Sequence, residues 1–218
     1  MSDADRRQAV RTVLLTGFEP FDEQPVNASW AAVQAVASAW EGPDRLLTRQ
    51  LPVSFRGARQ ALRTAVAEHA PDVVLCVGEA GGRFAVGIER VALNLIDARI
   101  PDNEGSAPVD VPVVAGAPTA FFSSLPVKAC ILAVRGTGVP VEVSHSAGTY
   151  VCNATFYALM HLLDGRPGVR GGFVHVPRTP EQVADGPSMA TADAARALVA
   201  LMRAAGADEV RLSGGVED

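Results

Sequence analysis

The chain of 218 residues lacks the features that mark membrane, secreted and nucleic-acid-binding proteins. No run approaches the roughly 18 uninterrupted apolar residues of a membrane span. The charged segment from Met1 to Arg11 has no apolar stretch typical of a secretory signal. Basic residues form no cluster in the sequence and the net charge is −5, which argues against nucleic acid as a partner. We therefore expect a soluble, cytoplasmic protein that binds neither membrane nor nucleic acid.

Cysteine and histidine are also scarce. Three cysteines, an odd number, fit a reducing compartment better than a disulfide framework. Cys76 falls in a buried-looking strand and Cys130 on an apolar helix, so we expect both to be structural. The chain has four histidines, and no His and Cys residues have the tight spacing of a zinc site. We expect no metal ion and no cofactor.

Repeats and low-complexity segments are absent, and 48% of the residues are hydrophobic, which is enough for one sizeable α/β core in a single domain over residues 1–218. Strand-like and helix-like segments alternate, which predicts a largely parallel sheet covered by helices on both faces. Expected strands are 12–16, 45–51, 73–77, 89–95, 139–143 and 171–177, and expected helices are 29–39, 56–69, 126–135, 152–163 and 192–205. The irregular stretch 97–124, interrupted by prolines and glycines, is expected beside a pocket or in a subunit contact.

A cysteine at a strand-to-helix junction is the most informative feature of the chain. The small-residue turn 146–153 contains Cys152 at the point where an apolar helix is expected to begin. Unpaired backbone N–H groups at a helix N-terminus favour an anion, so we expect them to lower the pKa of this thiol and to hold an oxyanion.

A histidine and a glutamate complete a candidate catalytic set. His175 lies near the carboxyl end of the expected strand 171–177, where ligands gather in open α/β sheets, and is the preferred base. His145 precedes the same turn as Cys152 and stays an alternative. Period-two alternation puts Glu89 on the apolar face of the strand 89–95. A buried carboxylate there needs Arg90, another cation or a histidine as its partner.

These residues and their neighbours resemble the pyroglutamyl peptidase I family, also called pyrrolidone carboxylate peptidases. The resemblance covers nearly the whole chain and is carried by blocks that occur in order at 14–21, 26–30, 81–83, 89–92, 98–105, 147–153 and 172–177. It implies a three-layer α/β/α sandwich with a mostly parallel, twisted central sheet, phosphorylase/hydrolase-like. It also implies a catalytic triad of Cys152, His175 and Glu89.

The resemblance further implies a cysteine peptidase that removes an N-terminal pyroglutamyl (5-oxoprolyl) residue from peptides through a thioester acyl-enzyme. Arg99 matches a position that contributes to the oxyanion site. The positions expected to bind the substrate or to line the pocket for the lactam ring are Phe18, Phe21, Asn27, Glu79, Ile100, Tyr150 and Val151. Microbial relatives form tetramers, so we expect a homo-oligomer.

The sequence departs from the family pattern at Glu79. Relatives commonly read Gly-Gln-Ala-Gly-Gly-Arg where this chain has Gly-Glu-Ala-Gly-Gly-Arg over residues 78–83. We expect Glu79 to be protonated or paired with Arg83, or else the substrate affinity and its pH dependence to differ from the family norm. Ala28, in place of a common proline, is expected to be silent.

Three other functions stay open at this stage. The glycine-rich turn 78–83 is compatible with a phosphate cradle in a nucleoside phosphorylase-like enzyme. A metal hydrolase would use His145, Cys152 and His175 as ligands. A ligand-binding module would keep the pocket and lose catalysis, if Glu79 has disabled the site.

Overall fold

The computed structural model describes residues 10–213. Within them, six strands form the central sheet in the order β2 (Arg45–Leu51), β1 (Thr12–Phe18), β3 (Val73–Ala80), β8 (Arg170–Pro177), β4 (Val86–Glu89) and β7 (Val141–Ser144). The first four strands of this order are parallel to one another. Strand β4 runs antiparallel to β8 and parallel to β7. The sheet is therefore mostly parallel, as the alternation of segments predicts.

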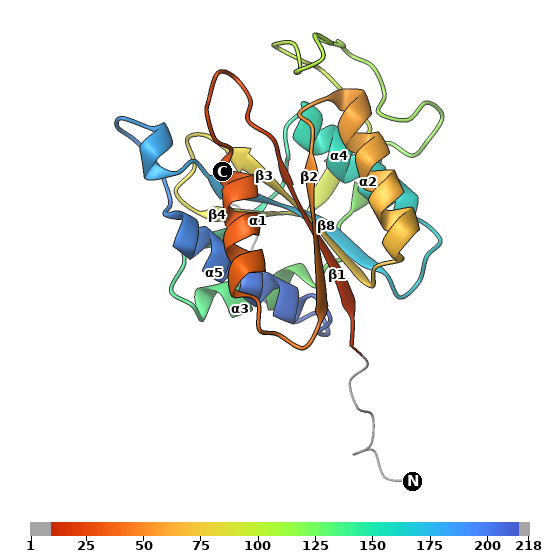
Figure 1. The fold of residues 1–218 in the computed structure, drawn as a ribbon. Coiled ribbons are helices and arrows are strands. Elements are labelled where there is room, and N and C mark those ends of the chain that lie inside the picture. Colours follow the sequence, from red (N-terminus) through yellow and green to blue (C-terminus); the bar gives the residue numbers. More distant parts are fainter. Residues whose placement is uncertain (1–9, 214–218) are drawn as a thin grey trace.

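Helices cover both faces of the sheet (Figure 1). One face packs against α1 (Ala28–Ala39), α3 (Val127–Arg135) and α5 (Thr191–Ala204), and the other against α2 (Phe55–His69) and α4 (Val151–Leu163). Side chains of β1 alternate between the two faces of the sheet. Val13 and Leu15 belong to the core on the side of α1, α3 and α5, and Leu14 belongs to the core on the side of α2 and α4. The expected three-layer α/β/α sandwich is thereby confirmed. Among the described residues, none of the helices combines the length and the apolar character required to pass through a bilayer.

The expected strand 89–95 is wrong, because it is broken after its first residue. Glu89 ends β4 in the central sheet, whereas β5 (Val91–Leu93) pairs with β6 (Ala120–Phe122) in a separate two-stranded sheet. Within β5 the buried residue is Ala92, so Glu89 and Val91 do not share one buried face. The chain changes sheets at Arg90, and a single period cannot continue across that break.

The stretch 97–124 is more ordered than its composition suggests. The stretch contains β6, and its Val111 forms an isolated antiparallel bridge with Ile96, the residue that precedes the stretch. The buried carboxylate of Asp102 accepts hydrogen bonds from the backbone N–H groups of Phe55, Glu104 and Ser106. These bonds close the segment on itself and fasten it to the start of α2.

Candidate active site

The carboxyl ends of β1, β3 and β8 and the start of α4 meet at one edge of the sheet. A cavity of about 190 Å³ opens there, with walls made by Phe18, Phe21, Val26, Asn27, Val53, Glu79, Gly81, Tyr150, Val151, Cys152 and Arg178. Ligand sites of open α/β sheets form at this edge because the connections there leave a crevice. Most of the site residues predicted from the sequence line this cavity.

Cys152 is the second residue of α4 and is partly exposed. Its sulfur lies against Gly78 of β3, so close that a Cβ at Gly78 would be 2.9 Å from Sγ. Gly78 is in turn the register partner of His175 in the neighbouring strand β8. The strand pairing therefore places His175 in register with the glycine against which the thiol lies.

The first turn of α4 keeps its backbone N–H groups available. Its N-cap residue, Tyr150, makes no side-chain hydrogen bond to that turn in the described structure. The buried side chain of Asn153 is committed to β5, where it accepts from Leu93 N and donates to the carbonyls of Leu93 and Leu95, each at 2.9 Å. Free N–H groups beside Cys152 are suited to stabilise an oxyanion.

A buried carboxylate orients His175. Nδ1 of His175 lies 2.7 Å from Oε1 of Glu89, and both residues are almost fully buried. The same oxygen accepts from Nη1 of Arg83 at 3.2 Å. Because the carboxylate accepts the Nδ1 proton, the neutral imidazole keeps its lone pair on Nε2. The partner of Glu89 is thus a histidine with a second cation, Arg83, and not Arg90.

The pKa of Glu89 is lowered although burial acts in the opposite direction. Burial is the largest single cause and raises it, but the hydrogen bond and the charge of His175, together with Ser144 and Arg83, outweigh burial. Glu89 is therefore a carboxylate at neutral pH. An ionised carboxylate at Nδ1 also stabilises the protonated imidazole that proton transfer would create.

The pKa of Cys152 is raised to about 12, against the sequence-based expectation of a lowered value. Burial of the sulfur is the largest cause, the negative charges of Glu89 and Glu79 add to it, and Arg83 opposes it. Burial and the two carboxylates both act against ionisation of the thiol. The resting residue is therefore a neutral thiol, and a base must remove its proton when it reacts.

Glu79 is paired, but with Arg178 and not with Arg83 as expected. Oε1 accepts from Nε of Arg178 at 3.1 Å, while Oε2 accepts from the backbone N–H of Ala28 at 2.7 Å and from Nε2 of Gln182 at 2.8 Å. The Glu79 side chain is 12% exposed, so these donors replace most of its water. The departure from the family pattern is compensated by three hydrogen bonds from this chain.

The other predicted site residues divide into two groups. Phe18, Phe21, Asn27, Tyr150 and Val151 line the cavity, whereas Arg99 and Ile100 are outside its lining, and Arg99 is exposed. The side chain of Asn27 caps α1 through Ser29 and also donates to the carbonyl of Glu19. The tyrosine hydroxyl donates to the carbonyl of Pro101 at 2.8 Å, which ties the segment 97–124 to the cavity.

Sequence reasoning missed Arg178 among the lining residues, together with Val26, Val53 and Gly81. Arg178 follows directly after the strand that carries His175, so its position at the carboxyl end of that strand was an available signal. His145, the alternative base, is exposed and is not among the residues that line the cavity. Residues 10–213 contain no group of three His, Cys, Asp or Glu side chains that is arranged to hold a metal ion.

A cysteine at the start of a helix, beside a histidine whose Nδ1 is held by a carboxylate, is the arrangement of a cysteine-dependent hydrolase on an α/β fold. The comparisons with known proteins make this class specific. A family model described as pyroglutamyl peptidase matches residues 11–208. The chain belongs to the pyroglutamyl peptidase family.

Relatives and solved structures agree with this assignment. A pyrrolidone-carboxylate peptidase of Clavibacter michiganensis is 53% identical over 211 residues, which cover 95% of this chain and 99% of the relative. One of Streptomyces coelicolor is 50% identical over 196 residues, 88% of this chain and 91% of the relative. The crystal structure of pyroglutamyl peptidase I from Bacillus amyloliquefaciens matches with a TM-score of 0.90 and 41% identity, and covers 94% of this chain and 100% of that protein. These findings confirm the resemblance and the fold class.

Proposed function

We propose that this protein removes N-terminal pyroglutamyl residues from peptides, with Cys152 as nucleophile, His175 as general base and acid, and Glu89 as the group that orients the imidazole. The observation that carries the proposal is the 2.7 Å contact between Nδ1 of His175 and Oε1 of Glu89, at the edge of the sheet where Cys152 lines the cavity. Family membership supplies the substrate class.

Acylation begins from the neutral thiol. Nε2 of His175 takes the Sγ proton as the sulfur attacks the carbonyl carbon of the pyroglutamyl residue, so a C–S bond forms and the carbonyl oxygen becomes an oxyanion. The first-turn N–H groups of α4 stabilise that oxyanion, because they lie beside Cys152 and receive no side-chain cap from Tyr150. Arg99, which is exposed, stays a prediction for this role.

The second half of the reaction returns the proton. The imidazolium gives its Nε2 proton to the leaving amine as the C–N bond breaks, which leaves a thioester on Cys152. A water molecule then loses a proton to His175 and attacks the thioester, and Cys152 leaves with that proton as free pyroglutamate is released. Glu89 stabilises the imidazolium formed in both halves, since its carboxylate stays ionised.

The cavity suits a small uncharged ring. Phe18, Phe21 and Val151 supply apolar walls in a volume of about 190 Å³. The charged groups at the wall are Glu79 and Arg178, which neutralise each other through their ion pair. A lactam enters such a site without leaving a charge unpaired, whereas an N-terminal glutamate would bring an ammonium and a carboxylate that lack partners there.

The test is hydrolysis of a pyroglutamyl amide reporter by the wild type, Cys152→Ala, His175→Ala and the double variant. We expect each single variant to lose several orders of magnitude in kcat and the double variant to be scarcely worse, because the residues act as a unit. Cys130→Ala is the matched control, since its thiol is buried on the opposite face of the sheet. Additive losses in the double variant, or no turnover by folded wild type, would refute the proposal.

We also propose that residues 1–218 act as one catalytic domain and that the protein is a cytoplasmic homo-oligomer, a tetramer. Phe84 and Phe122 support assembly, since each is 72% exposed and a contact between copies would cover them. Light scattering measures the mass of the protein in solution and so tests the assembly. A mass of about 22.7 kDa would show a monomer and refute the assembly.

A further inference from the structure

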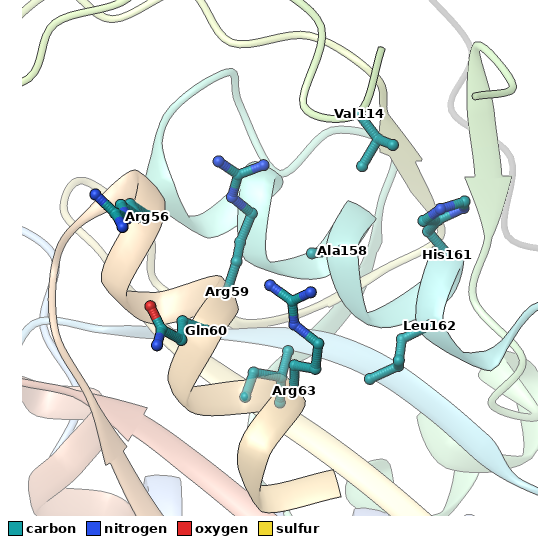
Figure 2. Close-up of a pocket in the computed structure, with 9 residues that line it drawn as sticks. Arg56, Arg59, Gln60, Arg63, Val114, Ala158, His161 and Leu162 are labelled. Atoms are coloured by element: carbon teal, nitrogen blue, oxygen red, sulfur yellow. The ribbon is translucent and has the colours of Figure 1, made fainter. Parts of the chain in front are cut away.

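A second, larger cavity lies between α2 and α4. Its volume is about 750 Å³, and it shares no lining residue with the candidate active site. Figure 2 shows the side chains of Arg59 and Arg63 rising from α2 toward this space, with His161 and Leu162 of α4 across from them. The cavity is thus lined by cationic side chains from one helix and by an imidazole and an aliphatic side chain from the other.

Three arginines that are spaced apart in the sequence lie together on one face of α2. Arg56, Arg59 and Arg63 are spaced by three and four residues, so all three lie on one face of α2 over about 10 Å of helix. Arg59 is half-buried and anchored, with Nε donating to the carbonyl of Phe55 and Nη1 to that of Val113, each at 2.6 Å. Arg56 and Arg63 are exposed. One guanidinium is therefore held in place, and two more can close on a ligand beside it.

The positive charge of this cavity has no carboxylate to balance it. No Asp or Glu lines the cavity, and none of the three arginines forms an ion pair in the described part of the chain. Burial and then the charge of Arg63 lower the pKa of Arg59, so the neighbouring cations repel one another. In a protein of net charge −5, such a concentration of positive charge favours an anion from outside.

We propose that the cavity between α2 and α4 is a binding site for a small polyphosphate-bearing molecule of the nucleoside triphosphate class. Guanidinium groups bind phosphate oxygens in bidentate pairs, and a row of three matches a chain of phosphates better than a single anion. The volume exceeds what phosphates alone require, and Leu62, Val114 and Leu162 give an apolar wall for the rest of the molecule.

This site is independent of the proposed peptidase reaction. Its residues come from α2, from the C-terminal half of α4 and from Val114, whereas Cys152 stands at the N-terminal end of α4. A pyroglutamyl analogue should accordingly leave binding in the second cavity unchanged. Failure of one proposal therefore does not affect the other.

The experiment is calorimetric titration of the full chain with ATP, with sodium tripolyphosphate and with inorganic phosphate, all at the same ionic strength. We expect saturable one-to-one binding of ATP, weaker binding of tripolyphosphate because it lacks the apolar contacts, and weakest binding of phosphate. Arg56→Gln and Arg63→Gln should each weaken ATP binding about 10-fold, since each removes a charge-assisted contact. Arg203→Gln is the matched control, because it removes one exposed positive charge from α5 on the opposite face of the sheet.

Four results would overturn the proposal. These are no saturable binding of ATP or tripolyphosphate, an equal loss of affinity in Arg203→Gln, and displacement of ATP by a pyroglutamyl analogue. The fourth is a change of molecular mass in the Arg56→Gln, Arg63→Gln double variant, because it would show that the arginines contact another copy of the chain. Unchanged melting temperatures of the exposed-residue variants would show that altered binding does not arise from unfolding.

Discussion

The lack of room for a side chain at Gly78, beside Cys152, leads to a prediction about this glycine. A methyl group at this position would lie 2.9 Å from Sγ of Cys152 and 2.8 Å from two ring atoms of Phe173. The ring cannot yield easily, because Phe173 is fully buried and packs against Phe18, Phe156 and His175. In Gly78→Ala the sulfur of Cys152 must therefore shift from its place against β3.

The size of the effect follows from this geometry. A methyl group forced into a packed core costs about 1–3 kcal/mol, which lowers the melting temperature of a chain of this length by roughly 2–12 °C. A displacement of the nucleophile by about 1 Å costs about 100-fold in rate. We expect kcat to fall about 100-fold with little change in KM, since the apolar walls that are proposed to bind the ring are not altered.

The assay is steady-state hydrolysis of a pyroglutamyl amide reporter, combined with thermal unfolding. Gly136→Ala is the matched control, because Gly136 has helical backbone angles and a Cβ there would be no closer than 3.4 Å to its neighbours. We expect that control to keep full activity. If Gly78→Ala kept kcat within twofold of the wild type, Cys152 would not react from its position against Gly78.

Four further predictions concern the ionisable groups Cys152, Glu89 and Glu79. Alkylation of Cys152 by iodoacetamide without substrate should be slow at pH 7 and accelerate as the pH rises toward 12, because the thiol is protonated below its raised pKa; a rate that levels off below pH 7 would restore the expectation of a lowered pKa. Glu89→Gln should lower kcat about 1,000-fold or more, and Glu89→Asp less, because the amide cannot hold the Nδ1–H tautomer of His175. The pKa of Glu89 is lowered on folding, so its carboxylate stabilises the protein above the ordinary glutamate pKa of about 4.3. That stabilisation is lost as the pH falls from there through the lowered pKa, so the difference in melting temperature between wild type and Glu89→Gln should shrink with acidification; a difference that is independent of pH would contradict this account. Glu79→Gln should reduce the free energy of unfolding by about 1–3 kcal/mol, because an amide oxygen cannot accept from all three donors that now bond to the carboxylate. Thermal unfolding of Glu79→Gln, Arg178→Met and the double variant measures this loss. Strictly additive losses would show that Glu79 and Arg178 are not coupled.

Local patterns were sufficient for the layers of the fold and for two members of the site. The alternation of β-branched strands with amphipathic helices reports on neighbouring residues only, and it predicts the α/β sandwich correctly. Cys152 at a strand-to-helix junction and His175 at a strand end follow from the same local signals. These positions depend on short-range periodicity, and a single sequence displays it.

The surroundings of those residues depended on tertiary structure. The alternation argument placed Glu89 on a buried face of one continuous strand, whereas its burial comes from the end of β4, next to β8 in the central sheet. The raised pKa of Cys152 depends first on burial of its sulfur and then on carboxylates from β3 and β4, which lie far from it in the sequence. Strand order decides these contacts, and strand order is a long-range property.

The contacts of Arg178 in the candidate active site and of the three arginines on α2 also depended on tertiary structure. Arg178 meets Glu79 because β3 and β8 are neighbours, although 99 residues separate them in the chain. Arg56, Arg59 and Arg63 are visible in the sequence, but their cavity exists only because α2 packs beside α4. The sequence by itself thus determined the elements and the reactive residue types, while the tertiary structure decided which charges face one another, because packing sets their distances and removes the water between them.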